Sequence, residues 1–117
     1  PGIAAVHDAG VADGVPILVT DFIDGVTLRE LARTRRLTPR EAAALTADVA
    51  DALEYAHAMG AVHRDVKPAN ILIAPGDPDA PGSAGRPVLV DFGLALRDQD
   101  GATLTTEGQV LGTPAYM

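Results

Sequence analysis

The chain has 117 residues, a net charge of −7 and a hydrophobic content of 47%, and it contains no cysteine. These values fit one folded unit and exclude a disordered tail or a fibrous repeat. The acidic balance argues against nucleic acid or an anionic membrane as a partner bound through a general basic surface. No apolar run approaches the ~20 residues of a membrane-spanning helix. We therefore expect a soluble, cytoplasmic segment.

Two short apolar runs open the chain. Residues 3–6 and 16–23 are separated by residues 8–10 (Asp-Ala-Gly) and by Asp13-Gly14, residue types that favour turns. This pattern predicts two strands of a mostly buried sheet.

Two helices are predicted next. Residues 27–30 (Thr-Leu-Arg-Glu) form the pattern of a capping box that begins a short helix to about residue 35, and residues 38–41 (Thr-Pro-Arg-Glu) repeat it. Apolar residues then recur at steps of three and four, which predicts one amphipathic helix over 39–59, ended by Gly60. The stripe, expected in the core, consists of Leu45, Val49, Ala52, Leu53, Ala56 and Met59.

The second half of the chain is more irregular. Residues 71–73 and 88–90 are short β-prone runs that we expect to pair. Between them, residues 75–87 are rich in Pro, Gly, Asp and Ser, which indicates a flexible surface insertion. Residues 91–117 have weak periodicity and are predicted to form a long functional loop.

The densest group of polar side chains is in residues 63–70 (His-Arg-Asp-Val-Lys-Pro-Ala-Asn). A carboxylate, an ammonium and a carboxamide lie within six residues, on a loop held between a helix and a strand. Pro68 restricts the loop, and loops of this kind often carry catalytic groups. A merely solvated turn is the alternative.

A second motif, Asp91-Phe92-Gly93, follows directly on the predicted strand 88–90. A carboxylate at a strand end, followed by a bulky anchor and a Gly pivot, suits the binding of a hard cation such as Mg²⁺ through oxygen. An ordinary turn is the alternative for this motif alone. Residues 112–117 (Gly-Thr-Pro-Ala-Tyr-Met) alone could form any turn.

In this order and spacing, the three motifs together resemble those of eukaryotic-like serine/threonine protein kinases, which have an α+β fold. The resemblance covers nearly the whole chain. It implies a partial kinase domain, with residues 1–23 as small-lobe strands and hinge and residues 24–117 as part of the large lobe. The activation segment would begin at residue 91. The insertion at 75–87 is longer than such kinases usually carry, and its role stays open.

The resemblance implies ATP and Mg²⁺ as cofactors and serine or threonine hydroxyls of proteins as substrates. Asp65 would accept or orient the proton of the substrate hydroxyl, and Lys67 would neutralise charge on the transferring phosphoryl group. Asn70 and Asp91 would bind Mg²⁺ and, with it, the nucleotide. Thr113 would hydrogen-bond near Asp65 and Lys67 and shape the platform for the substrate.

Two further groups follow from the same resemblance. Asp21 and Ile23 match hinge positions whose backbone groups bind adenine, and Thr20 matches the gatekeeper. Arg64 precedes the catalytic Asp, as in kinases that are activated by phosphorylation, and could pair with a phosphate on the loop after residue 93. The candidate acceptors there are Thr103, Thr105 and Thr106.

Three histidines complete the set of candidates. His63 is expected to act as a scaffold beneath residues 91–93, whereas His7 and His57 show no partner pattern and are assigned no chemistry. The Gly-rich phosphate loop and its strand lysine are absent, since Lys67 is the sole lysine. We therefore expect an excerpt of a longer, bacterial protein that is a poor enzyme by itself.

Two other classes stay open. One is a non-catalytic, kinase-like module that binds nucleotide or a partner protein. The other is a kinase-fold enzyme acting on small molecules, against which Arg64, Lys67 and residues 112–117 argue, because they belong to the pattern of protein-substrate kinases.

Overall fold

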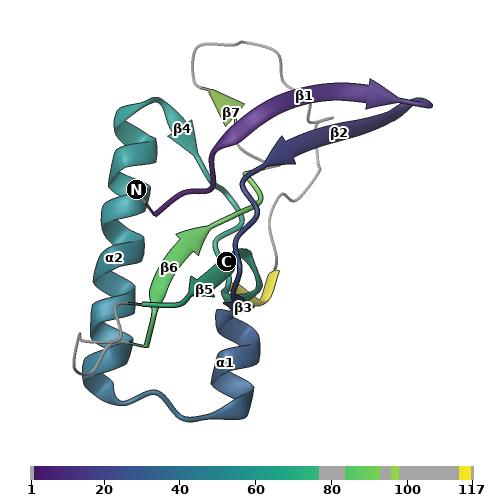
Figure 1. Ribbon diagram of the computed structural model, residues 1–117. Coiled ribbons are helices and arrows are strands. Elements are labelled where there is room, and N and C mark those ends of the chain that lie inside the picture. The colour runs from purple at the N-terminus through teal and green to yellow at the C-terminus, as the bar shows by residue number, and fades with distance from the viewer. Residues whose placement is uncertain (1, 77–83, 93–95, 98–113, 117) are drawn as a thin grey trace.

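A three-stranded antiparallel sheet lies at the centre of the computed structural model, which describes residues 2–76, 84–92, 96–97 and 114–116. Leu72 faces Val88 across its main strand pair, as the two β-prone runs predict. In Figure 1 the sheet lies between the two helices. Its strands, in spatial order, are β3 (Val26–Thr27), β5 (Ile71–Ala74) and β6 (Arg86–Leu89).

Both predicted helices are present, α1 over Leu28–Thr34 and α2 over Pro39–Ala58. The two capping boxes are confirmed. The hydroxyl of Thr38 accepts a hydrogen bond from the backbone N–H of Glu41 (3.2 Å), and the Glu41 carboxylate accepts one from the backbone N–H of Thr38 (2.8 Å). Each box satisfies backbone donors that the first turn of a helix would otherwise leave unpaired.

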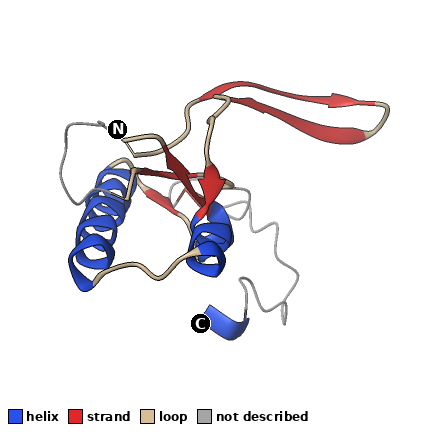
Figure 2. Ribbon diagram, turned by 60° about the horizontal axis from the view of Figure 1, so that its bottom comes forward, coloured by secondary structure: helices blue, strands red, loops and turns tan. Residues whose placement is uncertain are grey.

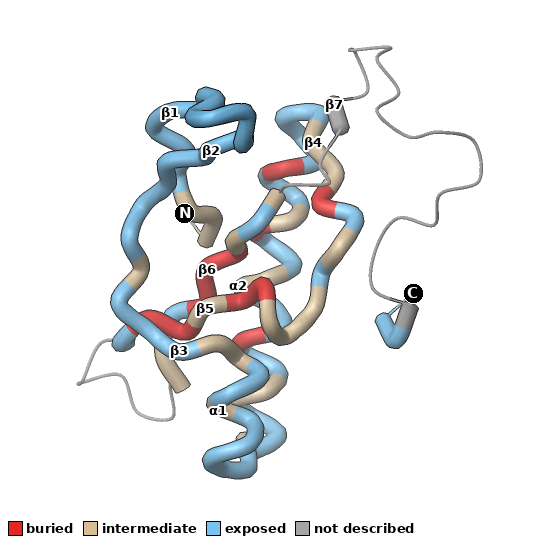
Figure 3. Tube along the Cα trace, turned by 90° about the vertical axis from the view of Figure 1, so that its right-hand side faces the viewer, coloured by how far each residue is buried: buried red, intermediate tan, exposed pale blue. Residues whose placement is uncertain are grey.

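The core lies where the helices meet the sheet, with α2 against β6 and α1 against β5. Figure 2 shows both helices beside the strands, and Figure 3 shows that the buried residues gather in β5, β6 and one face of α2. Met59 is 60% exposed, so its place in the predicted core stripe is wrong. It caps the end of α2 rather than facing the sheet. The buried cluster consists of Leu45, Ala52, Ile71, Ile73 and Leu89.

The N-terminal hairpin differs from the prediction in its bounds. Strand β1 spans Val6–Ala12 and pairs with β2 (Val15–Thr20), so the turn predicted at residues 8–10 is wrong. The turn at Asp13-Gly14 is confirmed: both residues have positive φ (52° and 78°), as a two-residue type I′ turn requires. Residues 2–4 instead run beside β6, where the N–H of Leu89 donates to the carbonyl of Gly2 (2.8 Å).

The hairpin is also far more exposed than its apolar sequence predicts. Every residue of β1 and β2 is exposed, Val11 by 71% of its surface. In Figure 1 the hairpin projects from the body of the molecule, and no second layer covers it within the part of the chain that the structure describes. The expectation of a mostly buried sheet is therefore wrong for these residues.

Short elements complete the described chain. The segment after residue 91, predicted as a loop, contributes a short strand at Leu96–Arg97. The insertion predicted at 75–87 ends earlier than expected, because Arg86 and Pro87 belong to β6. None of the helices in the described ranges is long and apolar enough to cross a membrane. The short elements are β4 (Ala61–Val62), which pairs with β7 (Leu96–Arg97), and the 3₁₀ helices η1 (Pro68–Asn70) and η2 (Pro114–Tyr116).

Candidate active site

Two donors converge on one oxygen of the Asp65 carboxylate. Lys67 Nζ lies 2.6 Å from Asp65 Oδ2, and Asn70 Nδ2 donates to the same oxygen at 3.2 Å. Asn70 Nδ2 also donates to the backbone carbonyl of Asp65 at 3.0 Å. Only 11% of the Asp65 side chain is exposed, so these charge-assisted contacts act with little competition from water. The structure thus brings together three of the predicted catalytic residues.

The 3₁₀ helix η1 places Asn70 beneath this loop. Pro68 occupies its first position, where a residue without N–H costs nothing, and the N–H of Asn70 donates to the carbonyl of Lys67 (2.9 Å). The N–H of Val90 donates to the carbonyl of Asn70 at 3.0 Å, which ties the loop to the end of β6. Asp91 follows directly, so the two sequence motifs meet at this contact.

His63 packs between the two motifs and is only 1% exposed. Its Nε2 lies 3.2 Å from the carbonyl oxygen of Val90, and its Nδ1 accepts from the N–H of Asp65 at 3.4 Å. Since a carbonyl only accepts and an amide N–H only donates, Nε2 carries the ring proton. The ring centroid lies 4.4 Å from that of Phe92. His63 therefore lies where a scaffold residue between the two motifs is expected from the sequence.

Two non-glycine residues at this site have left-handed backbone conformations. Arg64 has a φ of 64° and Asp91 a φ of 62°, and both residues are exposed. Such conformations are uncommon for residues with a Cβ and persist where the surrounding structure imposes them. Both residues adjoin the hydrogen bonds described above, and this strain is typical of functional loops.

Asn70 and Asp91 offer the ligand chemistry that Mg²⁺ prefers. A carboxamide oxygen and a carboxylate are hard oxygen donors. Among the described residues, no three His, Cys, Asp or Glu side chains gather in a way that could hold a metal ion alone. Mg²⁺ commonly takes one or two protein oxygens and keeps several waters beside the phosphates of its substrate.

The predicted hinge begins at Asp21, directly after β2. Its carboxylate accepts from the N–H of Ala5 (3.0 Å) and lies 2.7 Å from His7 Nε2. These contacts, the backbone N–H first, hold the pKa of Asp21 below its ordinary value. The Thr20 hydroxyl makes a long contact of 3.4 Å with the Asp21 carbonyl, and Ile23 is partly buried. His7 is a contact residue that the sequence analysis missed.

Four predicted site residues have no structural account. Thr103, Thr105, Thr106 and Thr113 lie outside the described residues. Arg64, the predicted partner of a phosphate on that segment, is described and exposed.

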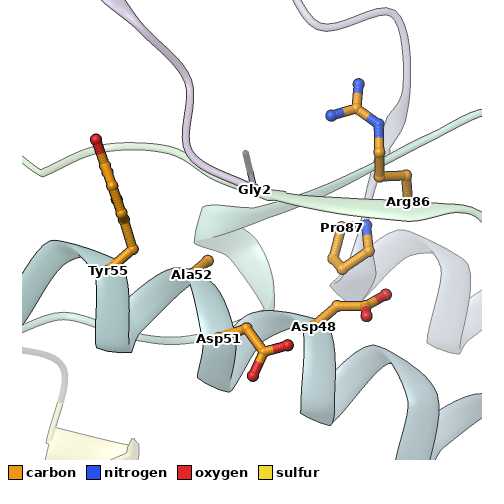
Figure 4. A pocket seen from close by; sticks show the side chains of 7 residues that line it. All are labelled: Gly2, Asp48, Asp51, Ala52, Tyr55, Arg86 and Pro87. Atoms are coloured by element: carbon orange, nitrogen blue, oxygen red, sulfur yellow. The ribbon is translucent and has the colours of Figure 1, made fainter.

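A cavity of about 520 Å³ lies elsewhere, between α2 and β6 (Figure 4). The N-terminal segment approaches α2 closely here: a Cβ at Gly2 would lie 2.9 Å from the Cβ of Ala52. No predicted site residue contributes to its wall, so its size does not make it the centre of the chemistry. It is lined by Gly2, Asp48, Asp51, Ala52, Tyr55, Arg86 and Pro87.

Comparison with known proteins gives one family and several bacterial relatives. The protein kinase domain family matches residues 1–117. The serine/threonine-protein kinase PkaB of Streptomyces coelicolor is 44% identical over 119 residues, which cover all of this chain and 28% of PkaB. PkaA of the same organism is 47% identical (21% of its length), and PknB of Mycobacterium tuberculosis 37% identical (18% of its length). The chain thus spans less than a third of the relatives it matches.

Proposed function

Because the chain belongs to the protein kinase domain family, we propose that the protein carrying it transfers the γ-phosphate of ATP to serine and threonine hydroxyls of proteins, with Mg²⁺ as cofactor. Its bacterial relatives are named serine/threonine-protein kinases. The observation that carries the proposal is the convergence of Lys67 and Asn70 on the carboxylate of Asp65. Phosphoryl transfer depends on positioning and charge, and this arrangement supplies both.

Each residue of the site has a defined role in this proposal. Asp65, held by Lys67 and Asn70, orients the substrate hydroxyl and accepts its proton. Lys67, a neighbour of that carboxylate, offsets negative charge on the phosphoryl group in transfer. Asn70 and Asp91 would hold Mg²⁺, which would neutralise charge on the phosphates. The backbone of Asp21 and Ile23 binds the adenine edge.

The division of the chain follows from these roles. We assign residues 1–23 to the small lobe and hinge and residues 24–117 to the large lobe, with the activation segment from residue 91. The reaction takes place in the cytoplasm, because ATP is available there.

Regulation is proposed to act through Arg64. A phosphate on Thr103, Thr105 or Thr106 would pair with this exposed guanidinium and order the segment. Mass spectrometry of the active protein should find at least one of the three threonines phosphorylated. Three unmodified threonines in a fully active sample would rule this out.

The function is tested with the protein expressed from its complete gene. We expect labelled γ-phosphate to reach a protein acceptor only when Mg²⁺ is present, and Asp91→Asn to reduce transfer by about 100-fold or more. ATP binding is measured in parallel by calorimetry. Binding without any transfer would contradict the proposal and favour the non-catalytic module, and transfer to a small molecule alone would favour the third class.

A further inference from the structure

Asp21 is held by Ala5 and His7, at the start of strand β1, through three contacts at the point where the chain leaves the hairpin. Its backbone N–H donates to the carbonyl of Ala5 at 2.9 Å. Its Oδ2 accepts from the N–H of Ala5 at 3.0 Å, and its Oδ1 lies 2.7 Å from His7 Nε2. Both carboxylate oxygens and the backbone of one residue are thus engaged by a segment that is 14 to 16 positions away in sequence.

A β-bulge brings His7 into this contact. Val6 faces Thr20, but Asp8 faces Val19, so two steps along β1 match one step along β2. His7 is the extra residue. A bulge leaves its extra residue unpaired and redirects its side chain, and such irregularities are frequent beside functional sites. Here the redirected imidazole reaches past the end of β2 to the carboxylate of Asp21.

We propose that His7 is a positioning residue for the adenine of ATP, acting through the carboxylate of Asp21. This inference rests on the proposed function, in which the backbone of Asp21 and Ile23 binds the base. The chain after Thr20 has left the strand pair, and the contacts of Asp21 with Ala5 and His7 restrain the backbone at the start of the hinge. A hinge that is held in its binding conformation before the nucleotide arrives loses less conformational freedom on binding.

The size of the effect follows from exposure. The side chains of His7 and Asp21 are 57% and 42% exposed, so the pair is partly screened by water. An exposed ion pair contributes only a small free energy to holding the hinge. Its loss should therefore change the affinity for the nucleotide by about two- to fivefold. The N–H of Ala5 continues to hold Asp21 when His7 is replaced, so the hinge is loosened and not lost.

The experiment compares His7→Leu with His7→Gln, whose amide can still donate to Asp21, and with His57→Leu as a control at an exposed position on α2. Calorimetry gives the dissociation constants of ATP and of adenosine, and steady-state kinetics give kcat. We expect His7→Leu to raise the dissociation constants of ATP and adenosine by the same two- to fivefold factor and to leave kcat unchanged. His7→Gln should recover most of the loss, and His57→Leu should match the wild type.

Unchanged binding of both ligands in His7→Leu, with or without a loss of kcat, would overturn the inference, and so would equal losses in His7→Leu and His7→Gln. A loss seen with ATP but not with adenosine would place the effect at the phosphates and also contradict it. Failure of the proposed function shows in the wild-type protein itself, which would then either bind neither ligand or bind ATP without transferring its γ-phosphate to a protein.

Discussion

His63 donates a hydrogen bond to the backbone carbonyl of Val90, 27 positions later in the chain, at 3.2 Å. Its other ring nitrogen accepts from the N–H of Asp65. One buried imidazole thus joins the loop that carries Asp65 to the strand end that carries Asp91. The two motifs are separated in sequence, and this side chain fixes their relative position.

Replacing His63 by Leu should destabilise the protein by about 2–4 kcal/mol. Leucine retains bulk but can neither donate to the carbonyl of Val90 nor accept from the N–H of Asp65, and losing a buried hydrogen-bond partner costs about 1–3 kcal/mol. Urea unfolding measures the loss. His57→Leu, on the exposed surface of α2, should change stability by less than about 1 kcal/mol. Equal losses in the two variants would contradict the scaffold role of His63.

Gly25 should not tolerate a side chain. A Cβ there would lie 2.4 Å from the carbonyl oxygen of Ile73, which is backbone and cannot move aside without disturbing β5. Gly25→Ala should therefore cost more than about 2 kcal/mol in unfolding free energy. Gly10→Ala is the matched control, since nothing lies within 4 Å of the added atom. If Gly25→Ala and Gly10→Ala had the same stability, the close approach to β5 would be wrong.

The capping box of α2 should be measurable on its own. Thr38→Ala removes the hydroxyl that accepts from the N–H of Glu41 and should cost about 1 kcal/mol in thermal or chemical unfolding. Thr46→Ala tests the helix interior, where the hydroxyl donates to the carbonyl of Ala42. Alanine is the better helix former there, so this variant should be neutral or slightly more stable. If Thr46→Ala were less stable than Thr38→Ala, the assignment of Thr38 as the N-cap of α2 would be refuted.

Acid should weaken the same helix start. The Arg35 guanidinium, followed by the N–H and hydroxyl of Thr38, lowers the pKa of Glu41 from 4.5 to about 2. A carboxyl with a lowered folded-state pKa stabilises the fold above its unfolded pKa, and this contribution is lost as the pH falls from about 4.5 to about 2. The stability difference between the wild type and Glu41→Gln should therefore be constant from pH 7 to 5.5 and shrink by pH 3.5.

Removing the strongest cause gives a second variant for this test. In the Arg35→Leu background, the stability difference caused by Glu41→Gln should depend less on pH. The Glu41 carboxyl then keeps only its contacts with Thr38. If the stability difference caused by Glu41→Gln stayed constant down to pH 3.5 in the wild-type background, the ion pair between Arg35 and Glu41 would be contradicted.

Local signals in the sequence predicted local structure well. The Thr and Glu residues of the capping boxes, and the Asp13-Gly14 turn, act within a few residues, so their patterns are sufficient. The grouping of Asp65, Lys67 and Asn70 was predictable for the same reason, since all three lie on one short loop.

What the sequence could not predict depends on partners far along the chain. The bulge at His7 arises from the register of β1 against β2, and a one-residue shift leaves no pattern in the sequence. The exposure of Val11 and Met59 depends on whether another layer covers them, which apolar character alone does not reveal. The left-handed conformation of Asp91 is likewise set by the surrounding fold.

The central claim is that Asp65 carries the phosphoryl transfer, and Asp65→Asn tests it most directly. The amide keeps the shape of the side chain but removes the charge and the proton-accepting carboxylate. Single-turnover transfer of the γ-phosphate should fall by about 100-fold or more, with the dissociation constant of Mg²⁺-ATP within about twofold of the wild type. Asp48→Asn, on the exposed face of α2, should transfer normally. Wild-type transfer rates in Asp65→Asn would contradict the account.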